Sequence, residues 1–383
     1  MMKSGRGAPT RNAVRSILML LPAVPLMFLS APMAAARGRH IAPVVPPPAV
    51  PVASAADDTP PVPQAGSCIA HVLSLPLLTG EGSPGVAITF GAAKGMAFLG
   101  MSQETLGVFE RPGLEYDHGR AVHMQTITGP AETFETTVDR LELGRGTARQ
   151  VPAIILGRMD GKVAGLPILG VVGYDILGNY DVLMDFPRHI ITLFRETGAA
   201  ACSPLPALVG AHAYSALLMP NAQGMNVTVQ VSLNGALVGM EVEPGSNASV
   251  LRTADAADIG VGKAELAADP RSRTDAGNAI IGRRHRFAPV AIGTWHGASL
   301  SADVTNAQFN ILGMDFLRGR RVLFAFPTRM FYFSDVQPDA AGAASATLSL
   351  AQSRLADVEV QQDDGGPPAA PPPAPAPAPP PGR

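Results

Sequence analysis

Two aspartates occupy the same place in a stretch of sequence that occurs twice. Residues 170–194 read GVVGYDILGNYDVLMDFPRHIITLF, and residues 309–334 read FNILGMDFLRGRRVLFAFPTRMFYFS. A shift of 140 positions without a gap superposes a glycine and an aspartate of the two stretches: Gly173 on Gly313 and Asp175 on Asp315. Two carboxylates held together can share one proton and act as general base and general acid. The repeat therefore raises the question of a catalytic pair, and it indicates two copies of one half-domain.

The sequence around these aspartates favours a structural role over a catalytic one. Each aspartate follows two apolar residues and a glycine, where a short helix would begin, and a carboxylate in the first turn of a helix interacts favourably with its N-terminus. We therefore expect four structural residues: Gly173, Asp175, Gly313 and Asp315. Asp185 follows the strand expected over 182–184 and has Ala325 as its equivalent, so we expect a dispensable role for it.

Strand patterns dominate the middle of the chain. Apolar and polar residues alternate up to Leu233, as in a half-buried strand. The next two residues, Asn-Gly, are the dipeptide that most strongly predicts a hairpin, and an apolar return strand covers 237–242. A short helix is expected from Thr253, as its N-cap, to Gly260. These patterns predict an all-β fold of two duplicated, mainly antiparallel half-domains, each with a short helix after the apolar-apolar-Gly motif.

This order of elements resembles the retropepsin-like half of aspartic proteases. The resemblance is carried by 227–251 with 311–333 in the second half, and by 171–194 in the first. It implies a bilobal β fold, in the manner of pepsin-like or tandem retropepsin-like enzymes, with a cleft between the lobes for an extended peptide. It also implies an Asp-Thr/Ser-Gly motif in each lobe, whose two aspartates share a proton and activate a water molecule.

Neither half carries that motif. In the second half Glu243, a proline and Gly245 stand in its place, and in the first half Gly100 or Met101 occupies the catalytic position. One hypothesis is a degenerate homologue that binds peptide, with Glu243 as an exposed turn residue near the cleft. A second is an active aspartic-type endopeptidase that uses Glu243 with another carboxylate, such as Glu104. A third is a purely structural protein of the cell envelope.

Other chemistries have weaker sequence support. The histidines lack the His-Glu-x-x-His spacing of a zinc hydrolase, and Gly-x-Ser-x-Gly is absent, so we expect no metal and no cofactor. Residues 275–277, Asp-Ala-Gly, lack a preceding apolar strand and are expected to form a loop. Trp295 and Tyr116 are expected either on hairpins over the cleft or in ordinary packing.

The ends of the chain are expected not to be globular. Four basic residues precede an apolar run and a small-residue stretch within 1–36, the layout of a secretory signal peptide, with an uncleaved membrane anchor as the alternative. A Pro/Ala-rich linker follows at 37–67. An Ala-rich segment that could form a helix and a Pro/Ala-rich tail make up 338–383. The two lobes are expected at 68–202 and 203–337, in a protein exported to the periplasm or secreted.

Charge and cysteine content agree with export. Removing the four basic residues of the leader from 29 leaves 25 against 31 acidic residues, a net charge near −6, so nucleic acid is not an expected partner. The chain has two cysteines, Cys68 and Cys202, near the two ends of the first lobe. In an oxidising compartment they could form one disulfide, and two separate buried thiols are the alternative.

Overall fold

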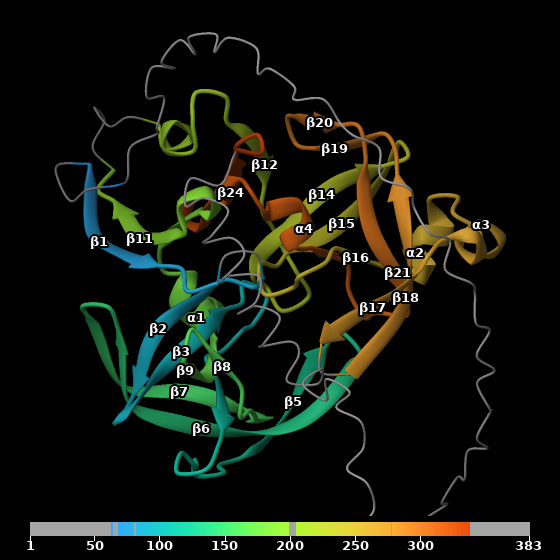
Figure 1. The fold of residues 1–383 in the computed structure, drawn as a ribbon. Helices are drawn as coiled ribbons and strands as arrows, with labels where there is room; N and C mark the ends of the chain where they lie inside the picture. The colour runs from blue at the N-terminus through green and yellow to red at the C-terminus, as the bar shows by residue number, and fades with distance from the viewer. Residues whose placement is uncertain (1–62, 64–67, 80–81, 199–203, 277, 338–383) are drawn as a thin grey trace, which may run out of the picture. The chain divides into compact units, whose positions relative to one another are not determined.

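The computed structural model describes residues 63, 68–79, 82–198, 204–276 and 278–337. The predicted signal peptide, nearly all of the linker, the Ala-rich segment and the tail lie outside these residues. So does Cys202; Cys68 is disulfide-bonded, and its pairing with Cys202 stays a prediction. Within the described residues, no helix has the length and apolar character that a membrane crossing requires. The all-β prediction is confirmed, because three sheets account for most of the described chain (Figure 1).

The first sheet is built within 85–172. Its order is β2-β3-β9-β4-β7-β6-β5, with β8 on β9, and a further β2–β6 pairing closes it on itself. All pairs are antiparallel except β3–β9 and β4–β7. Its strands are β2 (Gly85–Phe90), β3 (Ala93–Leu99), β4 (Gly107–Glu110), β5 (Ala121–Thr126), β6 (Gly129–Leu143), β7 (Gly146–Arg158), β8 (Lys162–Val163) and β9 (Leu166–Val172).

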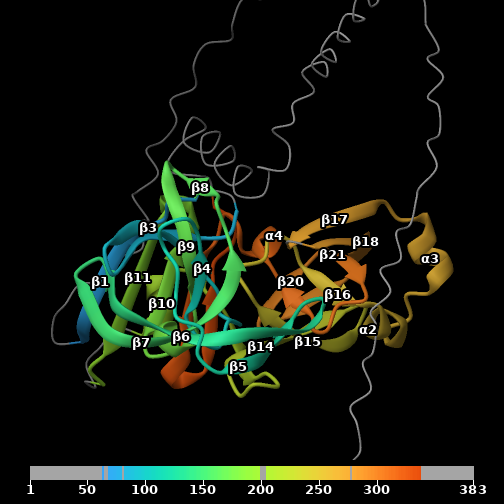
Figure 2. The ribbon, with the colours of Figure 1, turned by 90° about the horizontal axis from the view of Figure 1, so that it is seen from below.

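The second sheet is built within 219–312. Its order is β17-β18-β21-β16-β22-β15-β14-β19-β20, with β13 on β14. Its strands are β13 (Met219–Pro220), β14 (Asn226–Leu233), β15 (Ala236–Val242), β16 (Val250–Arg252), β17 (Arg271–Ala276), β18 (Asn278–Phe287), β19 (Val290–Ile292), β20 (Trp295–Gly297), β21 (Leu300–Thr305) and β22 (Ile311–Leu312). The strands of the first sheet are drawn in blue to green and those of the second in yellow to orange (Figures 1 and 2).

Two local predictions for the second sheet have different outcomes. The Asn234-Gly235 hairpin is confirmed: β14 pairs with β15 across it, and both turn residues have positive φ, 53° and 88°, as a type I′ turn requires. The expected loop at 275–277 is wrong, because Asp275 and Ala276 belong to β17 and pair with β18. This short polar strand is stabilised by its backbone hydrogen bonds with β18. An apolar pattern in the sequence does not predict such pairing.

The third sheet joins the two halves of the chain. Its order is β1-β11-β10-β23-β24-β12. At its centre Leu183 of β10 lies opposite Leu323 of β23, its own equivalent in the repeat, so a local twofold axis passes between them. Its strands are β1 (Ile69–Pro76), β10 (Asp181–Asp185), β11 (Ile190–Glu196), β12 (Tyr214–Leu217), β23 (Arg321–Ala325) and β24 (Met330–Phe333).

Asp185, expected to be dispensable, is a buried member of this central sheet. Its side chain is 5% exposed; its Oδ1 accepts the N–H of Arg188 at 3.2 Å, and its Oδ2 lies 3.3 Å from Nε of Arg321. The equivalence with Ala325 in the repeat does not predict the ion pair, because the antiparallel pairing places Asp185 opposite Arg321 and not opposite Ala325. The expectation of a dispensable role is therefore not compatible with its contacts.

The helices are short and lie at the ends of strands. They are α1 (Tyr174–Leu177), α2 (Thr253–Asp258), α3 (Lys263–Ala268) and α4 (Met314–Leu317), with 3-10 turns η1 (Phe186–Arg188), η2 (Leu205–Leu208) and η3 (Phe326–Thr328). Helices α1 and α4 begin directly after Gly173 and Gly313, as predicted. The helix expected after Thr253 is confirmed, but its N-cap is Arg252, without a side-chain cap.

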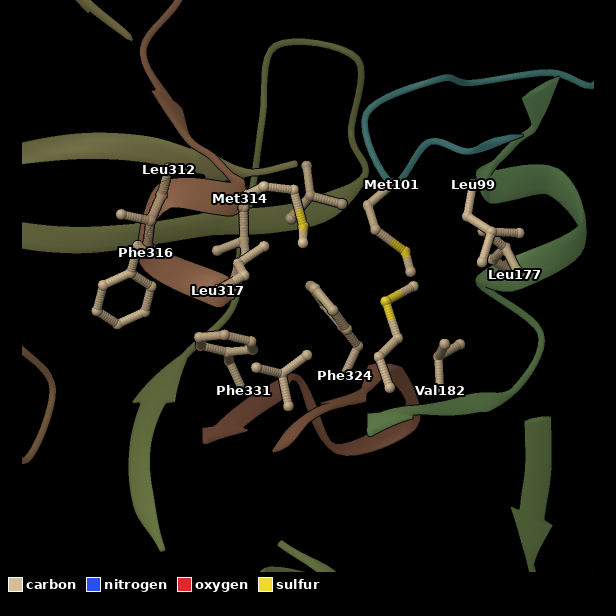
Figure 3. Close-up of a cluster of buried hydrophobic side chains, with 14 of the residues drawn as sticks. Leu99, Met101, Leu177, Val182, Leu312, Met314, Phe316, Leu317, Phe324 and Phe331 are labelled. Atoms are coloured by element: carbon tan, nitrogen blue, oxygen red, sulfur yellow. The ribbon is translucent and has the colours of Figure 1, made fainter. Parts of the chain in front are cut away.

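One apolar cluster is shared by both halves. Met101 from the first half and Met314 and Phe324 from the second point toward a common centre (Figure 3). All three side chains are fully buried. Burial of this shared cluster contributes to holding the halves together, at roughly 25 cal/mol per Å² of apolar surface removed from water.

Candidate functional site

The two copies of the repeated motif brace the loops that follow β3 and β15. Asp175 Oδ2 accepts the N–H of Leu106 at 3.0 Å, and Asp315 Oδ1 accepts the N–H of Ser249 at 2.9 Å and its hydroxyl at 2.5 Å. Arg284 donates to Asp315 Oδ2 at 2.6 Å. Burial raises the pKa of Asp175, although the backbone N–H donors lower it. Both carboxylates are thus directed at loop backbone and not at each other.

The two motif glycines allow α1 and α4 to lie close to the loops that they brace. A Cβ at Gly313 would meet the carbonyl oxygen of Ala248 and would lie 2.8 Å from that of Ser246. A Cβ at Gly173 would meet the carbonyl oxygens of Gln103 and Thr105 at 2.7 and 2.9 Å. These neighbours are backbone atoms, which cannot turn away, so any side chain at either position would displace the loop.

Replacing Gly313 by alanine should therefore destabilise the protein by about 3 kcal/mol, the range of an over-packed core. Chemical denaturation followed by tryptophan fluorescence would measure it. Gly239→Ala is the matched control in the same lobe, because its Cβ would meet only Thr228 Cγ2 at 3.4 Å and Gln230 Nε2 at 3.7 Å. Equal stability of the two variants would contradict the proposed role of Gly313.

Hydrogen bonds at the ends of β3 and β15 identify the first-lobe residue that corresponds to Glu243. Val172 and Leu312 are equivalent in the repeat. The carbonyl of Val172 accepts the N–H of Gly100 at 3.1 Å, and the carbonyl of Leu312 accepts the N–H of Glu243 at 3.1 Å. Gly100, and not Met101, therefore occupies the position equivalent to Glu243. The structure has one carboxylate where the resemblance implies two.

Glu243 links the two lobes through its carboxylate. Its Oε2 accepts the N–H of Ser102, from the first lobe, at 2.5 Å, and its Oε1 accepts the N–H of Gly245 at 2.5 Å. The residue is only 8% exposed, so it is not the exposed turn residue that the sequence suggested. Burial raises its pKa from the ordinary 4.5 to about 7, although both N–H donors act in the opposite direction. Glu243 is thus a buried acid that titrates near neutral pH.

A second carboxylate, that of Glu241, lies two residues earlier, near the end of β15. Burial raises the pKa of Glu241, and the charge of Glu241 in turn raises that of Glu243. Asn221 donates to Glu241 Oε1 at 3.2 Å. The buried Ser102 hydroxyl lowers the pKa of both glutamates, but it makes no hydrogen bond of standard geometry among the described atoms. The sequence feature that could have identified Glu241 is its i, i+2 spacing from Glu243, because this spacing places both side chains on one face of an extended segment.

Glu104 has a different environment. Its side chain is exposed, its carbonyl accepts the N–H of Asp175, and its charge raises the pKa of Asp175. The described contacts therefore connect Glu104 with the brace of the first loop, whereas Glu241 is the acid coupled to Glu243.

Two further contacts between the lobes surround the site. Ser83 donates its hydroxyl to the carbonyl of Gly245 at 2.7 Å and its N–H to Asn247 Oδ1 at 2.9 Å. At the tip of the β5–β6 hairpin, the carbonyl of Ile127 accepts the N–H of Gln308 at 3.0 Å. The loop after β15 is thus held by the first lobe, and a hairpin of the first lobe reaches the second.

The remaining sequence candidates have structural partners. Trp295 packs edge-to-face on Phe316, with ring centroids 5.4 Å apart, and Tyr116 packs against the apolar core. His118 lies 3.0 Å from a carboxylate oxygen of Glu110. Among the described side chains no group of three or more His, Cys, Asp or Glu could hold a metal ion.

Three comparisons with known proteins gave two likenesses. Residues 229–316, which contain Glu243 and Gly313, match a family model described as aspartyl protease. A search of the curated proteins found no match. The crystal structure of an aspartic proteinase from Irpex lacteus aligns with 71% of this chain and 99% of that chain, at 10% identity and a TM-score of 0.45. The resemblance predicted from the sequence is confirmed by the family match, which lies within the second lobe.

Proposed function

We propose that the chain is an exported, catalytically degenerate aspartic-protease-like protein that binds an extended peptide. The observation that carries the proposal is the equivalence of Gly100 with Glu243. Hydrolysis by the mechanism of the family needs two carboxylates that share a proton across the lobes. With glycine on one side, the position opposite Glu243 in the first lobe carries no carboxylate.

The neighbouring positions support the loss of chemistry. Where the family motif has a hydroxyl-bearing residue, this chain has Met101 and Pro244, both buried. Both oxygens of Glu243 already accept a backbone N–H, one from each lobe. In this arrangement the carboxylate connects two loops, which is a structural role and involves no substrate.

Peptide binding is supported by the edge of the first sheet. β5 is the last strand in the order of its sheet, and the hairpin that it forms with β6 reaches the second lobe at Gln308. An edge strand offers unpaired N–H and C=O groups to an extended peptide, which can add as a further strand.

Incubation with an unfolded protein substrate between pH 3 and 7 should leave the substrate intact, because the second carboxylate is absent. Mass spectrometry of the digest would detect any product, with an active aspartic protease as the positive control. Cleavage that disappears in Glu243→Ala would overturn the degenerate assignment.

A second candidate function follows from the coupling of Glu241 with Glu243. Glu241 and Glu243, two residues apart and both with raised pKa values, could share a proton and activate water without help from the first lobe. This endopeptidase would lose cleavage in both Glu241→Gln and Glu243→Gln. If the protein is degenerate, neither the wild type nor either of the two variants cleaves the substrate.

Binding and export have separate tests. A peptide that adds as a strand uses every second N–H, so N-methylation at alternate residues should abolish binding in one register and spare it in the other. Fluorescence anisotropy with the two peptides would measure this, and equal loss in both would contradict strand addition. Cell fractionation with and without residues 1–36 would test export.

A further inference from the structure

Two arginines face each other across a ladder of the second sheet. Arg271 of β17 pairs directly with Arg283 of β18, so their side chains lie on the same face. Like charges directly opposite each other in an antiparallel pair repel and destabilise the ladder. An anion bound between the two guanidinium groups would relieve this repulsion.

These arginines line a cavity with hydrogen-bonding walls. The cavity has a volume of about 340 Å³, within the size range of sites for small molecules. Its other lining residues are a glycine and polar or β-branched residues: Thr253, Gly282, Val304, Thr305 and Asn306. At Gly282 the lining is tightly packed, since a Cβ there would lie 3.0 Å from the carbonyl oxygen of Val304 and 3.3 Å from Cβ of Thr305. Two threonines and an asparagine thus add neutral donors to two guanidinium groups.

Three acids of neighbouring segments have other partners. Asp255 pairs with Arg252, Asp269 with His285, and Asp303 with Arg284. Arg283 donates to the backbone carbonyl of Asp269 at 2.9 Å. Among the described side chains, no carboxylate forms an ion pair with Arg271 or Arg283.

We propose that this cavity is a binding site for a small ligand that carries a compact oxyanion, a carboxylate or a phosphoryl group. A planar guanidinium fork matches either group with two parallel hydrogen bonds, and two forks on neighbouring strands can hold one anion between them. The site is separate from Glu243: β16 and β22 lie between β21, which lines the cavity, and β15. It does not depend on whether the protein cleaves or binds peptide.

Titration of the full chain with inorganic phosphate and, separately, with acetate tests the proposal, with sodium chloride at matched ionic strength as the baseline. Wild type should bind at least one of the two anions by calorimetry and melt at higher temperature in its presence. The anion that binds identifies the group. Arg271→Gln and Arg283→Gln should each weaken binding roughly tenfold or more, the loss expected for one charge-assisted hydrogen bond.

A second measurement separates a binding site from a merely structural pair. Without the anion, Arg271→Gln should melt no lower than wild type, because it removes a repulsion. Arg286→Gln is the matched control on β18, since this exposed arginine bonds Ser299 outside the cavity. It should keep the anion response. Absence of binding by wild type, or binding by both glutamine variants at the cavity as tight as that of wild type, would overturn the proposal.

Discussion

Replacing Asp185 by alanine should lower the free energy of unfolding by about 3–5 kcal/mol, the cost of removing one partner of a buried ion pair. The remaining guanidinium of Arg321 is 1% exposed and would stay in the central sheet without this carboxylate. Loss of the bond from the N–H of Arg188 adds to the effect, because Asp185 caps the turn η1. Urea or guanidinium denaturation would measure the change.

The same pair illustrates why a buried ion pair is not a source of net stability. Burial raises the pKa of Asp185 and lowers that of Arg321, so desolvation outweighs their mutual attraction for both groups. The double variant Asp185→Leu/Arg321→Leu should therefore recover much of the loss. Asp139→Ala, on the exposed face of β6, is the matched control and should change stability by less than about 0.5 kcal/mol. A similar small effect at Asp185 would contradict this account.

Local features of the fold were predictable from sequence because they depend on neighbours in the chain. The alternation up to Leu233 and the Asn-Gly turn determine the β14–β15 hairpin, and Gly173 and Gly313 mark the starts of α1 and α4. β17 was missed because its residues are polar and its stability comes from pairing with β18.

The candidate site was only partly predictable, for a similar reason. Glu243 was identified as the residue at the motif position, but its burial and its bond with Ser102 depend on how the lobes meet, which local patterns do not encode. Whether Gly100 or Met101 is equivalent to Glu243 could be decided only from the hydrogen bonds at the ends of two parallel strand pairs, β3–β9 and β15–β22. The role of Asp185 likewise required the pairing across the local twofold axis.

Besides Glu243, one carboxyl group of the central sheet titrates near neutral pH. Asp181 is 1% exposed, and burial, with the charge of Glu196, raises its pKa to about 7. Its equivalent in the repeat is Arg321, so the twofold symmetry of the backbone is not followed by the charges. A pH profile of stability will therefore contain contributions from both Asp181 and Glu243.

The variant Glu243→Gln should lose part of the pH dependence of stability. The pKa of Glu243 is about 7 in the folded state and near 4.5 when unfolded, so the folded state binds the proton more tightly. This stabilisation is fully present below pH 4.5 and is lost as pH rises to 7, a fall of about 3 kcal/mol in the free energy of unfolding. The amide of the variant does not titrate in this range, so the variant would show no such fall.

Denaturation curves of wild type, Glu243→Gln and Asp181→Asn between pH 4.5 and 8 would isolate this contribution. At pH 5 Glu243→Gln should be less stable than wild type by about 1–3 kcal/mol, because its amide directs an N–H at one of the two backbone donors. At pH 8 the difference should shrink or reverse, since wild type then buries a charge. Asp181→Asn should remove a separate part of the slope. A profile for Glu243→Gln parallel to wild type would show that the bridge between Ser102 and Gly245 does not titrate in this range.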